Sequence, residues 1–132
     1  MKSFIKIMIL KKGEKMKTDY EFLKVEIQNH ILVVSINRPD RMNALHPPSH
    51  SEFDQVWNEF HENDDLWVAI ITGEGERAFC AGNDLKYQAE GGDMMLGASS
   101  GFAGITHRFN LTKPVIAAVN GVAMGGGFEI AL

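Results

Sequence analysis

The sequence predicts an α/β domain in which helices cover a parallel or mixed sheet. Two short and almost wholly apolar runs, residues 66–71 and 115–119, have the composition of strands that are buried on both faces. Glycines follow each run, and a segment with helical character comes next. This alternation of strands and helices along the chain is typical of α/β domains.

The first two strands are predicted to pair as a hairpin. Residues 22–28 alternate between apolar and polar side chains, and residues 31–36 form a second β-rich run. Only Asn29 and His30 separate the two runs, and a two-residue break that contains asparagine favours a tight hairpin turn. Residues 37–40 are then predicted to form a further turn.

A helix is predicted after Pro47 and Pro48, which are expected to close an irregular stretch. Ser49 or Ser51 is the expected N-cap. The apolar residues that follow recur at the spacing of one helical face: Phe53, Val56, Trp57 and Phe60. This segment is therefore predicted to be an amphipathic helix that packs against the sheet.

The remaining elements are shorter and are separated by glycines. In order, we expect a brief extended piece at 79–81, one or two helical turns at 84–89, a mobile loop at 91–104, a helix at 105–111, a buried strand at 115–119 and a buried helix at 128–132. Asp84 could cap the first of these helices. Pro114 is expected to stop the helix at 105–111.

Charge divides the chain into two parts. The first 17 residues contain six lysines and one glutamate, a charge of +5, which leaves −9 for the rest of a chain whose net charge is −4. We therefore predict a basic, disordered extension at residues 1–17 and a folded domain at 18–132. A domain this acidic argues against nucleic-acid binding, because a basic face supplies most of the affinity for phosphates.

Three further properties limit the class of protein. Apolar residues make up 45% of the chain and charged residues 23%, as in an ordinary globular domain. The apolar run near the start is far shorter than the roughly 20 residues that span a bilayer, so no membrane span is expected. The single cysteine, Cys80, cannot form an internal disulfide, which suits the reducing cytoplasm.

Two glycine-rich loops, each after a predicted buried strand, are the candidate site. Residues 72–85 form the first loop and residues 120–129 the second. Glycine allows close backbone approach, so N–H groups from both loops could converge on one atom. At the start of the last predicted helix, the Gly126 N–H would be an unpaired donor suited to an oxygen that gains negative charge.

Glu129 lies three residues after Gly126, so its carboxylate and that N–H can face one cavity. Its apolar neighbours predict a buried carboxylate, which is costly unless it is paired or used in proton transfer. The alternative is a first-turn glutamate that only complements the helix dipole. The pattern alone leaves these two interpretations open.

Other residues with reactive side chains are predicted to be structural. His46 and His50 have helical spacing, but the prolines between them oppose a helix, so both are expected at the surface. Cys80 is expected in the core, because no basic residue beside it would favour the thiolate. Trp57 and Trp67 fit core positions. No metal site is predicted.

Three segments together resemble the crotonase superfamily, which includes the enoyl-CoA hydratases and isomerases. They are NRPDRMNAL at residues 37–45, AFCAGNDLK at 78–86 and KPVIAAVNGVAMGGGFEIAL at 113–132. The resemblance covers roughly residues 20–132 and corresponds to the N-terminal half of the family's fold. It implies the crotonase-like (ClpP/crotonase) spiral of β-β-α units, here truncated before the C-terminal half.

The resemblance also assigns roles to residues of the candidate site. It implies an oxyanion hole made by the backbone N–H groups of Asn83 and Gly126, with Glu129 as acid and base. Coenzyme A would lie along six residues: Arg41, Ala81, Asn83, Asp84, Leu85 and Lys86. The implied substrate is an acyl-CoA thioester, with no separate cofactor, and the implied assembly of the full-length parent is a homotrimer or hexamer.

Several functions fit this resemblance. The expected reaction is syn hydration or dehydration of an α,β-unsaturated acyl-CoA, and the alternatives are enoyl-CoA isomerisation and the dehydration of carnitinyl-CoA, which the segment 101–111 favours. A second catalytic glutamate would lie beyond Leu132. Because the chain ends within a predicted apolar helix, a truncated, inactive fragment or an interaction module is the alternative from another class.

Overall fold

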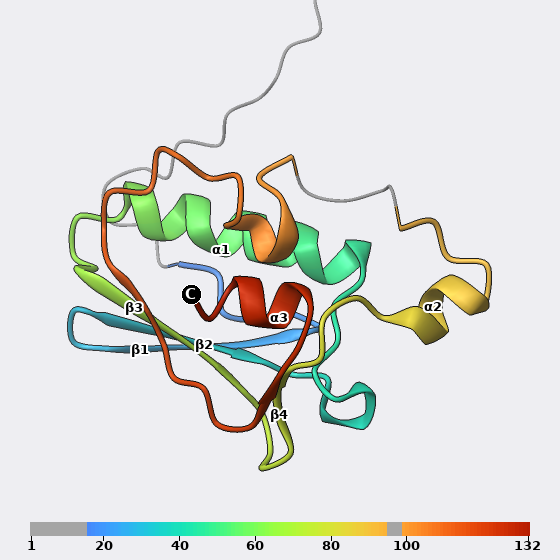
Figure 1. Ribbon diagram of the computed structural model, residues 1–132. Coiled ribbons are helices and arrows are strands. Elements are labelled where there is room, and N and C mark those ends of the chain that lie inside the picture. The colour runs from blue at the N-terminus through green and yellow to red at the C-terminus, as the bar shows by residue number, and fades with distance from the viewer. Residues whose placement is uncertain (1–15, 95–98) are drawn as a thin grey trace, which may run out of the picture.

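The computed structural model describes residues 16–94 and 99–132 (Figure 1). Most of the predicted N-terminal extension, residues 1–15, lies outside the described residues. Met16 is buried in the core, and the backbone N–H of Lys17 donates to a Glu59 carboxylate oxygen at 2.9 Å. Packing contacts of the domain therefore begin two residues before the predicted boundary at residue 18.

The described part of the chain contains two sheets. The larger has the order β1-β2-β3-β5, formed by β1 (Leu23–Gln28), β2 (Ile31–Ile36), β3 (Val68–Gly73) and β5 (Val115–Ala117). The smaller pairs β4 (Ala78–Cys80) with β6 (Val122–Ala123). The hairpin of β1 and β2 is antiparallel, as predicted, and the other pairs are parallel.

A β-β-α unit occurs twice in succession. In each unit the first strand joins the larger sheet, the second joins the smaller sheet, and a short helix follows: α2 (Leu85–Ala89) after β4 and α3 (Gly126–Glu129) after β6. Because β3 lies parallel to β5 and β4 to β6, the second unit lies beside the first in both sheets, with an irregularity in the pairing of β4 with β6. Figure 1 shows α2 standing away from the sheets, and none of its residues is buried.

The core lies between the larger sheet and α1 (Pro47–Glu62), which crosses above the sheet in Figure 1. The predicted apolar face of the helix is confirmed. All four of its residues are fully buried: Phe53, Val56, Trp57 and Phe60. They pack with inward-facing residues of β2, including Leu32 and Val34, in one hydrophobic cluster.

The start of α1 differs from the prediction. His46, rather than Ser49 or Ser51, is the N-cap, and Pro47 and Pro48 occupy the first turn. Proline is tolerated there because the first N–H groups of a helix have no intrahelical partner and its fixed φ suits the helix. The Ser49 hydroxyl accepts from the His46 N–H at 2.9 Å and donates to the His46 carbonyl at 2.7 Å.

The prediction of surface histidines is therefore wrong. His46 and His50 are 5% and 7% exposed. Burial is the main cause that lowers the pKa of each to about 4. Trp67 is also misplaced by the prediction, because it is 62% exposed and stacks on His30 with ring centroids 3.7 Å apart. Cys80, in contrast, is fully buried as predicted.

No α-helix forms at residues 105–111, contrary to the prediction. Ala103 and Gly104 both have positive φ, so the chain turns tightly through the 3-10 segment Phe102–Gly104. The Arg108 side chain donates from Nε to the Gly104 carbonyl at 2.8 Å. An α-helix would need this carbonyl for the backbone N–H of residue 108. Of the predicted mobile loop at 91–104, residues 95–98 lie outside the described residues.

The strand and helix at the C-terminal end are not buried as predicted. In β5, Ile116 is 55% exposed, and in α3 only Gly127 is buried. Phe128 and Leu132 are 54% and 91% exposed. An apolar run predicts burial only when another element covers it, and no described element covers the outer face of these residues.

Candidate active site

The two glycine loops lie side by side because β4 and β6 run parallel. The Met124 N–H donates to the Cys80 carbonyl at 3.0 Å, and the chain then continues into Gly82 on one side and Gly126 on the other. A Cβ atom on Gly82 would lie 2.8 Å from the Met124 carbonyl oxygen and 3.4 Å from the Gly126 nitrogen. Gly82 also has a φ of 94°, so only glycine fits this crossing.

Two backbone donors are unused where the loops meet. Among the residues that the structure describes, the N–H groups of Asn83 and Gly126 donate to no other group. Asn83 is exposed and directly follows Gly82, whose Cβ position adjoins the Gly126 nitrogen. The loops thus bring two free N–H groups to one edge of the molecule.

An aromatic ring covers the second loop. A Cβ atom on Gly126 would lie 2.6 Å from the ring of Phe102. The neighbouring Ala103 is held by α1: its N–H donates to His50 Nδ1 at 3.1 Å, and its carbonyl accepts from Trp57 Nε1 at 2.8 Å. The sequence analysis assigned no role to Phe102 or His50. The signal for His50 was its spacing, because His50 and Trp57 are seven residues apart and lie on the same buried face of α1.

Glu129 lies near the loops but not in the interior. Its side chain is exposed and borders a hollow of about 240 Å³ that Thr106, Val115 and Ile130 also line. The expectation of a buried carboxylate is wrong, because α3 has only four residues and Phe128 and Leu132 point to solvent. A helix this short also provides little dipole.

The six residues predicted along coenzyme A form one continuous region, but their side chains differ. Leu85 is 70% exposed and Lys86 is exposed, whereas Asp84 is 3% exposed. The Arg41 side chain is 29% exposed and forms only long ion pairs, at 3.8 Å to Asp84 and at 3.9 Å to Asp40 and to Glu90. The Ala81 N–H already donates a hydrogen bond to the Met42 carbonyl at 3.1 Å, so it is not available to a ligand.

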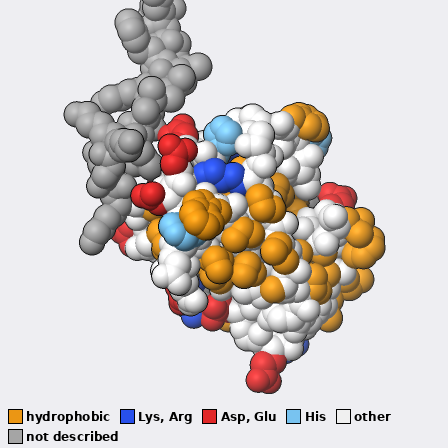
Figure 2. All heavy atoms as spheres, turned by 90° about the vertical axis from the view of Figure 1, so that its left-hand side faces the viewer, with side chains coloured by type: hydrophobic (Ala, Val, Ile, Leu, Met, Phe, Trp, Pro, Cys, Tyr) orange, Lys and Arg blue, Asp and Glu red, His pale blue; other side chains and the backbone are white. Residues whose placement is uncertain are grey.

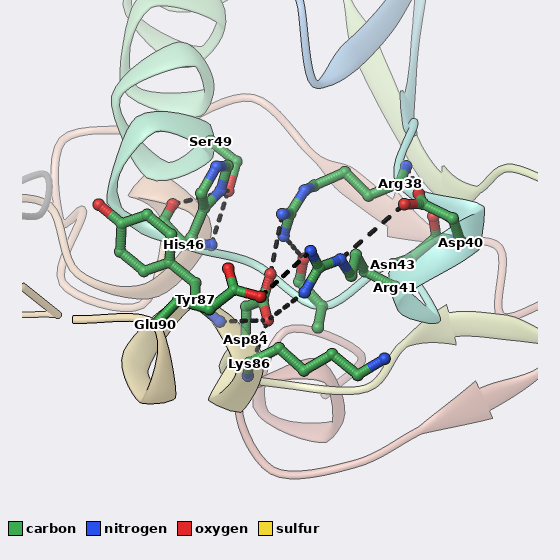
Figure 3. Close-up of polar contacts among 11 residues, drawn as sticks. Arg38, Asp40, Arg41, Asn43, His46, Ser49, Asp84, Lys86, Tyr87 and Glu90 are labelled. Carbon is green, nitrogen blue, oxygen red and sulfur yellow. Dashed lines mark hydrogen bonds and ion pairs between the residues drawn. The ribbon is translucent and has the colours of Figure 1, made fainter. Parts of the chain in front are cut away.

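Asp84 is the centre of the polar contacts in Figure 3. It caps α2 as predicted, because Oδ1 accepts from the N–H groups of Lys86 and Tyr87 at 3.1 and 3.0 Å. Its Oδ2 accepts from Arg38 Nη2 at 2.8 Å. Burial alone would raise the pKa of this carboxyl, but the Tyr87 N–H and the Arg38 and Arg41 guanidinium groups lower it below its usual value.

Other kinds of site receive no support from the geometry. Burial raises the pKa of the Cys80 thiol to about 11, so the thiolate needed for nucleophilic attack is disfavoured. Among residues 16–94 and 99–132, no group of three or more His, Cys, Asp or Glu side chains is placed to hold a metal ion. No helix in this described part has the length and apolar character needed to cross a membrane.

Stacked β-β-α units whose glycine loops meet at one edge define the crotonase-like class of fold. A family model described as enoyl-CoA hydratase/isomerase matches residues 26–132, and the chain belongs to this family. It is similar to carnitinyl-CoA dehydratase of Proteus mirabilis (strain HI4320), with 49% identity over 112 residues. It is 39% identical over 110 residues to (E)-benzylidenesuccinyl-CoA hydratase of Thauera aromatica.

Solved structures agree with this assignment. Carnitinyl-CoA hydratase from Mycobacterium avium superposes with a TM-score of 0.77 at 36% identity, over 85% of this chain and 43% of that one. Enoyl-CoA hydratase from Mycobacterium tuberculosis H37Rv gives 0.74 at 39% identity, over 84% and 42%. The matched segments are 83% and 82% of this chain but 42% and 43% of the two relatives, so the chain spans less than half of their length.

Proposed function

We propose that this chain provides the thioester-polarising part of an acyl-CoA lyase site, with hydration or dehydration of an α,β-unsaturated acyl-CoA as the reaction. The observation that carries the proposal is the meeting of two unused N–H groups, those of Asn83 and Gly126, where the glycine loops cross. Two donors on the thioester carbonyl oxygen would stabilise the negative charge that develops there, and one lost donor in such a hole costs roughly 3–4 kcal/mol.

Glu129 is the proposed acid and base. Its carboxylate borders a hollow beside the Gly126 loop, where the α- and β-carbons of a bound thioester would lie. In hydration it would hold a water and move a proton as the water adds across the double bond. The lysine and arginine at positions 86 and 41 would face the anionic groups of coenzyme A. Because coenzyme A is part of the substrate, no separate cofactor is needed.

Carnitinyl-CoA dehydration is the more specific candidate. Two of the four similar proteins described above are named as carnitinyl-CoA dehydratase or hydratase, and the first is 49% identical over the matched segment. The segment Phe102–Gly104, which covers the Gly126 loop, lies within the region that favoured this branch. Isomerisation is the other candidate within the family. We propose a cytoplasmic location and a trimeric or hexameric full-length parent.

The proposal is tested by exchange of segments between relatives. Residues 18–132 would replace the equivalent segment of the Proteus mirabilis carnitinyl-CoA dehydratase, and the chimera would be assayed with crotonyl-CoA and crotonobetainyl-CoA. Turnover of either thioester is expected. Glu129→Gln in the chimera should lower turnover at least about 100-fold while binding of the thioester survives, since the variant keeps the shape but loses the titrating proton.

Two outcomes would contradict the proposal. Near-normal turnover of the Glu129→Gln chimera would remove its acid and base role. A folded chimera that neither binds nor converts the two thioesters would favour the alternative, an inactive fragment or interaction module. The faster substrate of the two distinguishes a carnitinyl-CoA dehydratase from a general hydratase.

A further inference from the structure

Leu45 forms hydrogen bonds on both sides of Asn83. Its N–H donates to the Gly82 carbonyl at 2.8 Å, and its carbonyl accepts from the Asp84 N–H at 2.8 Å. Together these two hydrogen bonds form an isolated parallel β-bridge between Leu45 and Asn83. A short strand-like contact therefore fixes the backbone of the first glycine loop at the residue that carries the proposed oxyanion donor.

This contact sets the direction of the Asn83 N–H. The Gly82 carbonyl and the Asn83 N–H belong to the same planar trans peptide, so they point in opposite directions. Because the carbonyl points to Leu45, the N–H points away from Leu45. The segment that contains Leu45 thus determines where the donor points without contacting it.

Arg38 joins the two sides of this contact. Its Nη1 donates to the Ala44 carbonyl, and its Nη2 donates to Asp84 Oδ2 at 2.8 Å. Ala44 precedes Leu45 and Asp84 follows Asn83, so one guanidinium bridges the residues that flank the contact. Figure 3 shows the Arg38 side chain reaching Asp84. The Arg38 and Asp84 side chains are 11% and 3% exposed, and a charge-assisted bond at such burial is stronger than one in water.

We propose that Arg38 and Asp84 are positioning residues that aim the Asn83 N–H at the thioester oxygen. This inference rests on the proposed function, in which the Asn83 N–H is a donor to the thioester oxygen. Arg38 acts through Asp84 and the Ala44 carbonyl, and it does not contact the substrate. Loss of the pair frees the Asn83 peptide to rotate and weakens polarisation of the carbonyl.

The neighbouring Arg41 has a different environment. Its shortest ion pair to Asp84 is 3.8 Å long, and its side chain is 29% exposed against 11% for Arg38. Arg41 is therefore held less firmly and can meet an anionic group of coenzyme A, whereas both Nη groups of Arg38 already donate hydrogen bonds. The two arginines provide a matched pair, since the same substitution should change positioning at one and affinity at the other.

Hydrogen–deuterium exchange on the full 132-residue chain tests the positioning. In Arg38→Gln and in Asp84→Asn, the amides of Leu45 and Asp84 should exchange on the order of tenfold faster, since local opening of this contact becomes easier. Asp84→Asn keeps the oxygen that caps α2, so loss of the cap does not explain its effect. Arg38→Lys should recover part of the protection. Lys24→Gln, which removes a surface ion pair, is the matched control and should change nothing at this contact.

A second readout follows the chemistry. Crotonyl-CoA is added to each chain, and the Raman stretching frequency of its thioester carbonyl reports polarisation. A downshift is expected in the wild type and a smaller one in Arg38→Gln, whereas Arg41→Gln should bind more weakly with an unchanged downshift. If amide exchange at Leu45 and Asp84 becomes faster in Arg38→Gln but the carbonyl frequency does not change, Arg38 and Asp84 have a structural role only.

The failures are distinguishable. Unchanged exchange at Leu45 and Asp84 in both variants, with protection in β1 and β2 intact, would overturn the positioning inference. Absence of any carbonyl downshift in the wild-type chain would overturn the proposed oxyanion hole, and with it the purpose of the pair. If Arg38→Gln unfolds, Asp84→Asn and Arg38→Lys decide the question.

Discussion

Residues 115–132 are richer in apolar side chains than residues 23–73, but they are covered much less. In the first region, α1 packs on the larger sheet. Large side chains from both are completely buried between them, among them Trp57 and Phe53 of α1 and Leu32 of β2. In the second region, Ile116, Val119 and Phe128 are at least half exposed. Figure 2 shows hydrophobic side chains gathered over a broad area of one face of the molecule.

This contrast separates stability from the proposed chemistry. The first region contains nearly all of the fully buried side chains, so it should dominate the free energy of unfolding of the described domain. The second contributes Gly126 and Glu129 but little buried surface. The proposed site therefore joins Arg41 of the well-packed region to Gly126 and Glu129 of the weakly packed one.

The largest expected effect comes from the same substitution made once in each region. Phe60→Ala removes a fully buried ring and should lower the free energy of unfolding by about 3–5 kcal/mol. Phe128→Ala removes a ring that is 54% exposed and should cost about 0.5 kcal/mol or less. Urea unfolding measures both values. Equal losses would mean that the C-terminal region is as well packed as the first.

Acid should weaken the first region through its two buried histidines. Their pKa values are lowered to about 4 in the folded chain, mainly by burial, from an ordinary value of 6.5. Stability should thus be full above pH 6.5 and fall as the pH decreases toward 4, by at most about 1.4 kcal/mol per pH unit for each histidine.

Unfolding measured between pH 7.5 and 4.5 checks this slope. His50→Gln should flatten it by removing one of the two titrating groups. Protonated His50 also cannot accept from the Ala103 N–H, so the segment over Gly126 should loosen in the same pH range. A slope that His50→Gln leaves unchanged would exclude His50 as a source.

Two asparagines offer a comparison of intermediate size. Asn43 Nδ2 donates to the Glu74 and Ala78 carbonyls at 3.0 and 2.8 Å from a side chain that is 1% exposed. Asn120 Nδ2 makes two similar bonds from an exposed position. Asn43→Asp should cost about 1–3 kcal/mol, because an oxygen would face two buried carbonyls.

Asn120→Asp should cost less than about 1 kcal/mol, since water can solvate the new carboxylate. Thermal unfolding of the two variants at the same pH gives the comparison. The reverse order of costs would show that the turn at residue 120 is better protected from water than its exposure indicates.

The smallest effect on folding is expected at the exposed C-terminal face. Ile116→Lys and Val119→Lys should change the free energy of unfolding by about 0.5 kcal/mol or less, because both side chains are at least half exposed. Exposed apolar surface of this kind favours association. Light scattering should show a larger mass for the unmodified chain than for the double variant, and equal masses would exclude this face as the cause.

The sequence alone predicted the elements whose evidence is local. The hairpin needed only its alternation and the Asn29 break, and the buried face of α1 needed only its helical spacing. The cap at Asp84 and the core position of Cys80 follow from neighbouring residues in the same way. The three motifs carried the family, which the match over residues 26–132 confirms.

Tertiary structure decided what depends on partners far along the chain. Burial of His46 and His50, exposure of Trp67 and Phe128, and the Arg38 bridge to Asp84 arise from segments that meet only after folding. The last of these joins residues 46 positions apart. Periodicity reveals which side of a segment is apolar, but whether another segment covers that side, and which donor reaches which acceptor, is settled only by packing in three dimensions.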